Sequence, residues 1–268
     1  MVTGEAKVDK VVDFLKEKNI AIFQVNALTR NGREELMAIF NRVFIEFQLN
    51  VEYLFNIYSA IVEVIFNAIK ANVKYIFYQE EIKKRIKNHV RGENLSDIMH
   101  IILRTEALRD YLVRFVVSEK LKQQTMHMLK LEEIARTRKD SLTSEEYKML
   151  EEFHDKLKEE DMNIFFTIGI APHQVAFAVV NDSPIMRQDM QRIERSRRIH
   201  YELYLEGRSN HYFSMENIDT TESAGLGIAL ADEVYYELGL DPRQYFTIVT
   251  EQGRTRALLR FPRKRISL

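Results

Sequence analysis

The positions of the prolines constrain this chain most. All four lie in its C-terminal part, at residues 172, 184, 242 and 262. Because proline interrupts helices, the chain before them is free to form long ones. Apolar residues from Leu36 to Tyr58 follow helical spacing without a break, and a second strongly apolar segment runs from Ala60 to Phe77. The sequence therefore predicts a long helix over 33–58 and another over 60–77.

Strand patterns are concentrated after Asn163. Two β-rich runs, 163–170 and 175–181, meet at a turn containing Pro172, and residues 245–262 form a second such hairpin. Between the hairpins, the pattern predicts a helix over 186–205, a polar loop over 207–223 and a helix that opens at 225–227 and ends near 239. Upstream, residues 20–25 read as a short strand and residues 30–32 as a turn. This order predicts an α+β fold in which helices cover one face of a mixed sheet.

The stretch between these regions is charged and helical. Residues 79–160 contain glycine only at position 92, Ser96 is a suitable N-cap, and Thr143 with Glu146 makes a capping box. We therefore expect a large helical insertion over 79–160. The predicted domains are an N-terminal strand and helical region, 1–58, and a second domain, 59–268, that contains the insertion.

Composition and charge exclude several classes of function. The chain has no cysteine, which excludes disulfides, thiolate zinc sites, iron–sulfur clusters and cysteine nucleophiles. Its formal net charge is −1, so no global field favours nucleic acid or an anionic membrane. The N-terminus lacks the features of a signal peptide, and charged residues interrupt the apolar stretch 51–78, as in a core helix rather than a membrane span. We expect a cytoplasmic protein. No pair of histidines shows zinc-ligand spacing.

Two elements carry residues suited to nucleotide chemistry. Glu63, Asn67 and Lys70 lie at i, i+4 and i+7, on one face of the predicted helix 60–77. Such a stripe faces solvent or, if buried, requires partners. The second element is the run TTESAGLGI over 220–228. Its glycines allow close approach of the backbone to a phosphate, and the helix start that follows offers free N–H groups. A tight loop followed by an N-cap would explain that run equally well.

In order and spacing, these elements resemble the N-box and the second glycine box of the GHKL (Bergerat-fold, histidine-kinase-like) ATPases. The resemblance implies a two-layer α/β sandwich that binds ATP and Mg²⁺. It implies that Asn67 ligates Mg²⁺, that Glu63 is the catalytic residue orienting or deprotonating the attacking group, and that Lys70 contacts phosphate. The glycine box would bind the phosphates through Ser223, Gly225, Leu226 and Gly227.

The resemblance extends to the terminal hairpin but is weaker at the first glycine box. Thr255 would lie near the adenine, although a β-branched residue at the start of a strand is also ordinary. The family's aspartate that reads the adenine amine corresponds to Asn181 or, with a shift of one residue, to Asp182. Both glycines of that box are missing here, which puts nucleotide affinity and base choice in question.

The resulting expectation is an ATP-binding signalling protein that acts as a kinase on a separate protein partner. The first histidine, His89, follows the N-box, so the usual autophosphorylation site of sensor kinases is absent. Residues 207–224 would form a lid, and segments 33–58 and 79–160 would serve dimerisation or partner docking. One alternative is a catalytically inactive scaffold or nucleotide sensor of the same fold. Another is an unrelated helical interaction protein.

Overall fold

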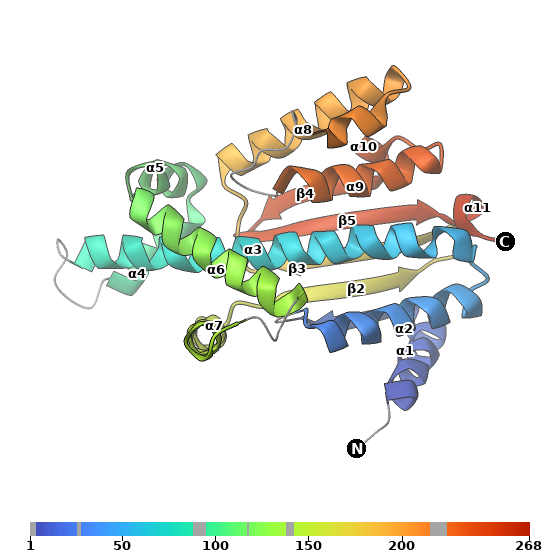
Figure 1. Ribbon diagram of the computed structural model, residues 1–268, viewed down its shortest axis with the longest axis horizontal. Coiled ribbons are helices and arrows are strands. Elements are labelled where there is room, and N and C mark those ends of the chain that lie inside the picture. Colours follow the sequence, from blue (N-terminus) through green and yellow to red (C-terminus); the bar gives the residue numbers. More distant parts are fainter. Residues whose placement is uncertain (1–3, 26–27, 88–94, 117, 138–141, 215–223) are drawn as a thin grey trace.

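The computed structural model describes residues 4–25, 28–87, 95–116, 118–137, 142–214 and 224–268 (Figure 1). The first half of the chain contains α1 (Gly4–Lys18), β1 (Ile20–Gln24), α2 (Arg30–Glu46), η1 (Val51–Tyr53), α3 (Leu54–Lys87), α4 (Leu95–Arg104), α5 (Glu106–Val116) and α6 (Glu119–Thr137). The second half contains α7 (Ser144–Glu159), β2 (Ile164–Ile170), β3 (Gln174–Asn181), α8 (Arg187–Leu205), η3 (Ser209–Phe213), α9 (Ala224–Glu237), α10 (Pro242–Tyr245), β4 (Phe246–Glu251), β5 (Arg254–Pro262) and α11 (Arg263–Ile266).

The strands form one five-stranded sheet in the order β1-β2-β3-β5-β4. Every neighbouring pair is antiparallel, so the prediction of a mixed sheet is wrong. The two predicted hairpins, β2–β3 and β4–β5, are confirmed. The chain leaves β3, passes through α8 and α9 to the edge strand β4, and returns in β5 beside β3. This route makes the central β3–β5 pair antiparallel as well.

Helices α2, α3 and α9 pack on one face of this sheet (Figure 1). The side chains that point toward them are buried, as the alternating pattern of β2 shows most clearly. The fold is therefore α+β, with a layer of helices on a five-stranded antiparallel sheet. The predicted α+β class is confirmed at this level.

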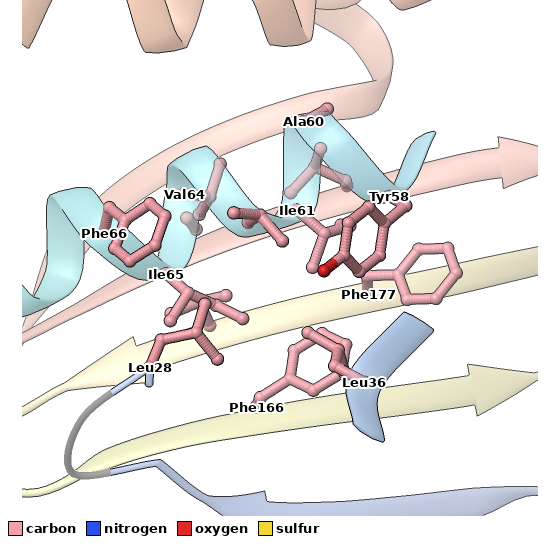
Figure 2. Close-up of a cluster of buried hydrophobic side chains, with 14 of the residues drawn as sticks. Leu28, Leu36, Tyr58, Ala60, Ile61, Val64, Ile65, Phe66, Phe166 and Phe177 are labelled. Atoms are coloured by element: carbon pink, nitrogen blue, oxygen red, sulfur yellow. The ribbon is translucent and has the colours of Figure 1, made fainter. Parts of the chain in front are cut away.

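Aromatic residues fill the space between the two layers. The Phe40 ring of α2 stacks on Phe177 of β3, with ring centroids 5.1 Å apart, and Phe177 also stacks with Phe166 of β2. Figure 2 shows Ile61 and Ile65 of α3 above these sheet residues. Full burial of each such side chain contributes about 1.5–3 kcal/mol, so this cluster fixes α3 on the sheet.

The predicted boundary between the two long helices is wrong. The helix expected over 33–58 ends at Glu46 as α2, and the next one, α3, runs unbroken for 34 residues from Leu54. Between them, Gln48 adopts a left-handed conformation with φ 55°, and the Asn50 side chain accepts a hydrogen bond from the Glu52 N–H. Apolar spacing continues through this bend because its residues remain in the same core. Periodicity alone therefore did not reveal it.

Smaller sequence signals had mixed outcomes. The capping box of Thr143 and Glu146 at the start of α7 is confirmed. Residues 30–32, predicted as a turn, instead form the first turn of α2, because Thr29 caps that helix by accepting a hydrogen bond from the Gly32 N–H. Ser96 is not an N-cap, since α4 already begins at Leu95. The predicted loop 207–223 contains η3, and residues 215–223 lie outside the described residues.

Helix α3 is both long and apolar. In the described part of the chain it is the one helix long and apolar enough to cross a membrane, and 56% of its most apolar window is buried inside the protein. It lies against the sheet and α9. Its apolar side chains thus form part of the protein core.

Candidate functional site

Glu63 and Asn67 lie one turn apart on α3 and face the beginning of α9. A Cβ atom placed on Gly227 would lie 2.9 Å from Glu63 Oε2 and 3.3 Å from Asn67 Nδ2. Only glycine accommodates so close an approach without displacing one of the two side chains. The structure therefore brings both polar residues of the predicted N-box to the last glycine of the predicted glycine box.

The rest of the glycine box opens helix α9. The helix begins at Ala224, so Gly225, Leu226 and Gly227 all belong to its first turn. Backbone N–H groups in a first turn have no intrahelical acceptor, and the helix dipole makes this end positive. The Glu63 carboxylate consequently lies at the end of α9 that favours negative charge. Ser223, the remaining predicted residue of the box, lies outside the described residues.

The Asn67 amide is unusual because its buried Nδ2 atom has no hydrogen-bond partner in the described structure. An unsatisfied buried amide costs about 1–3 kcal/mol. The two ends of an amide are interchangeable by rotation, so Asn67 can present either a donor or an acceptor to a bound group. Lys70, the third residue of the stripe, lies about one turn further along α3 and is half-buried.

A second polar cluster lies at the end of β3. Asn181 and Thr255 are direct cross-strand neighbours, and both are buried. Asn181 Nδ2 donates to Asn72 Oδ1 at 3.2 Å and to Ser183 Oγ at 2.5 Å. Thr255 Oγ1 donates to the Ser183 carbonyl at 2.6 Å. The structure thus brings together the two residues predicted to lie near an adenine, and they are already bonded through Ser183.

Asp182 lies apart from this cluster. Its carboxylate pairs with Arg254 at 2.7 Å and accepts a hydrogen bond from the Asn163 N–H at 3.0 Å. Adjacent residues at the end of a strand point to opposite sides of the sheet. Of the two alternatives left by the sequence, Asn181 is therefore the residue on the helix side, whereas Asp182 is engaged elsewhere.

Helix α3 connects the two clusters. Asn67 faces α9, and Asn72 contacts Asn181 from another side of the same helix. Five residues correspond to a rise of about 7.5 Å. The clusters are thus separate but close, and one helix holds both.

Buried side chains and a hydrogen bond fill the space around the segment that follows β3. Ser183 and Pro184 are buried, and the Ile185 N–H donates to Thr250 Oγ1 at 3.1 Å. In the GHKL ATPases that the sequence resembles, glycines would occupy these positions and leave room for the nucleotide. Sequence reasoning missed Asn72, Ser183 and Thr250 as parts of this cluster. A signal existed for Asn72 alone: it is an amide on the otherwise apolar, sheet-facing side of α3.

Buried charges join α9 to α8. Arg197 makes a two-pronged ion pair with Asp232, at 2.8 and 2.9 Å. Burial raises the pKa of Asp232, although Arg197 opposes that rise. Beside it, His200 Nε2 lies 2.9 Å from Glu233 Oε2, and this hydrogen bond lowers the pKa of Glu233. Helix α9, which carries the glycine box, is therefore fixed on two sides, by α3 and by α8.

A cavity of about 290 Å³ lies near the ends of β1 and α7. Its lining consists of Gln24, His154, Leu157, Lys158, Asp161, Met162 and Asn163. None of the predicted site residues belongs to that lining. Within the described part of the chain, Asn163 links this lining to the β3 cluster, because its carbonyl accepts a hydrogen bond from Asn72 Nδ2 at 3.3 Å.

The described residues contain no group of three or more acidic or imidazole side chains that could hold a metal ion. The predicted Mg²⁺ site does not require one, since Mg²⁺ commonly takes one or two protein oxygens together with phosphates and water. No family model matches this chain, and neither the curated proteins nor the solved structures contain a match to it.

Proposed function

We propose that this chain is an ATP-binding signalling protein of the histidine-kinase-like type, and that it acts as a kinase on a separate protein partner. One observation supports the proposal most: Glu63 and Asn67 of α3 converge on Gly227, in the first turn of α9. These residues are about 160 positions apart in sequence, and the GHKL resemblance requires this convergence. The same resemblance supplies their roles.

The types of residue at this site are those that a magnesium–nucleotide ligand would use. The buried Nδ2 atom of Asn67 has no hydrogen-bond partner in the described structure, and after rotation of the amide its oxygen would hold Mg²⁺, which neutralises phosphate charge when bound. The first-turn N–H groups of Gly225, Leu226 and Gly227 would bind phosphate oxygens. Glu63 would orient the attacking hydroxyl and accept its proton. Lys70 would add positive charge along the same face of α3.

A second candidate function is a protein-binding scaffold of the same fold that has lost nucleotide turnover. It is favoured by the β3 cluster, where Asn181 and Thr255 already bond to Ser183. A base that entered here would have to replace those bonds. The buried Pro184 further closes a segment where the family carries glycine.

Titration calorimetry with Mg-ATP tests the first proposal. We expect binding by the wild-type chain and loss of at least tenfold in affinity for Asn67→Ala. The control is Asn41→Ala, because Asn41 is an exposed asparagine on α2 and its loss should leave affinity unchanged. No binding heat at millimolar Mg-ATP, or equal affinity in both variants, would refute nucleotide binding at this site.

Phosphoryl transfer requires a separate measurement. We expect Glu63→Gln, which keeps the size of the side chain, to bind Mg-ATP like the wild type while transfer of labelled phosphate to water or to a co-purified protein falls by at least a hundredfold. Wild-type binding without any turnover would favour the scaffold over the kinase.

A further inference from the structure

The face of the sheet opposite α2, α3 and α9 is open in the described structure, and much of it is apolar. Ile22 and Ile20 of β1 are 63% and 44% exposed, and Val249 of β4 is 40% exposed. Phe165 and Leu258 lie between these edges and are half-buried. A solvated face of an antiparallel sheet usually carries polar side chains. Apolar side chains on a face that would otherwise be solvated indicate an interface.

Part of the centre of this face carries small residues. Gly169, Ala176 and Ala178 occupy neighbouring positions on β2 and β3. Small side chains at the centre allow a second layer to approach to the roughly 10 Å spacing of packed sheets. The surface therefore suits another sheet better than a bulky ligand.

We propose that two copies of this chain pack through these open faces, sheet on sheet, with a two-fold axis parallel to the strands and close to β3. The proposal does not depend on nucleotide binding. It also differs from the dimerisation through helices that the sequence suggested.

Strand order and charge select this orientation. A two-fold axis along β3 places β1 over the partner's β4 and β2 over its β5, because the order is β1-β2-β3-β5-β4. Phe165 and Arg256 occupy the same cross-strand row. Each Arg256 would then lie over the ring of Phe165 in the other copy, a favourable cation–π arrangement.

The alternative two-fold axis, perpendicular to the strands, is disfavoured by repulsion. It would place β5 over β5 and oppose Arg256 to Arg260, which lie on either side of Leu258 on the open face. Like charges brought together at an interface cost several kcal/mol. The arginines of β5 thus favour the two-fold axis parallel to the strands over the perpendicular one.

The available area is sufficient for a stable dimer. Strands of five to nine residues are about 16–30 Å long, and five strands are about 20–24 Å wide. Each copy would contribute roughly 500–600 Å², so both together reach the about 1,000 Å² expected of a specific interface.

Sedimentation equilibrium or light scattering of the full chain tests the proposal. We expect a dimer in the micromolar range, and Ile22→Lys should raise the dissociation constant at least tenfold. The matched control is Ile45→Lys. Ile45 is the same residue type and is 62% exposed, but it lies on α2, so dimerisation should persist. A second variant, Ala176→Arg, places a long charged side chain at a half-buried position of the face and should give monomers with an unchanged circular dichroism spectrum.

Crosslinking tests the orientation, because the chain has no cysteine of its own. Ile22 and Thr247 lie in one row, on β1 and β4. A mixture of Ile22→Cys and Thr247→Cys chains should crosslink with a short bis-maleimide, and Ile22→Cys alone should not. A monomeric wild type, equal effects of the Ile22 and Ile45 variants, or crosslinking of Ile22→Cys only to itself would each overturn the proposal.

Discussion

At the scale of single residues, Gly227 determines how closely α9 approaches α3. Gly227→Ala would place a methyl group 2.9 Å from Glu63 Oε2 and 3.3 Å from Glu63 Cβ. The Glu63 carboxylate can rotate away, but its Cβ cannot. We expect a loss of about 1–3 kcal/mol in the free energy of unfolding, the usual cost of overpacking. Urea denaturation measures it.

Glu63→Gly removes both the carboxylate and the Cβ atom that the new methyl group would meet, so the same Gly227→Ala change should cost less in that background. The control is Gly169→Ala, where a methyl group would meet ordinary contacts at 3.8 and 4.0 Å and stability should stay the same or rise. Equal costs for Gly227→Ala with and without Glu63 would show that the two residues do not contact each other in solution.

At the scale of elements, an ion pair joins α6 to α7. His154 Nε2 of α7 lies 2.5 Å from Glu132 Oε1 of α6. This hydrogen bond raises the pKa of His154 above its ordinary value of 6.5. Because the folded-state pKa is raised, the pair contributes fully below about pH 6.5, and its contribution disappears as pH rises through the folded-state pKa.

We therefore expect the wild type to be more stable than His154→Gln near pH 6, by up to about 1 kcal/mol because the pair is partly exposed. That difference should shrink toward about pH 9. Thermal unfolding across this range measures it. His127→Gln is the control, since His127 is exposed on α6. A difference that stays constant or grows with pH would contradict the ion pair.

At the scale of the whole molecule, one hydrophobic cluster extends from the N-terminal helices into the inserted ones. It includes Met128 and Leu131 of α6 as well as Phe166 and Phe177 of the sheet. The C-terminal end of α3 instead packs with α4 and α5 in a small separate cluster around Ile82 and Met99. Part of the insertion thus shares the main core, and part of it packs separately.

Native-state hydrogen exchange should resolve these two parts. Amides of α4 and α5 should exchange at a lower free energy of opening than those of α6, because regions with few buried apolar contacts open locally. Met99→Ala should lower protection in α4 and α5 only, whereas Leu131→Ala should lower it throughout the chain. Equal protection of α4 and α6 would show that the two clusters unfold as one.

The sequence by itself located all five strands and most of the helices, although it predicted no helix at α1 and placed a turn where α2 begins. Runs of β-forming residues bounded by turns identified the strands, and local side-chain chemistry identified the Thr143 cap, because both signals are complete within a few residues. It also singled out Glu63, Asn67 and Gly227, since their residue types and spacing are local properties.

The tertiary structure alone decided which of these residues meet. It ended α2 at Glu46 through a bend that apolar spacing concealed, and it made all neighbouring strands antiparallel. It placed Asn181 beside α3 and Asp182 beside Arg254. It also left one face of the sheet without helices in the described part of the chain. The physical reason is the same in each case: these outcomes depend on packing between segments far apart in sequence, and no local pattern records that packing.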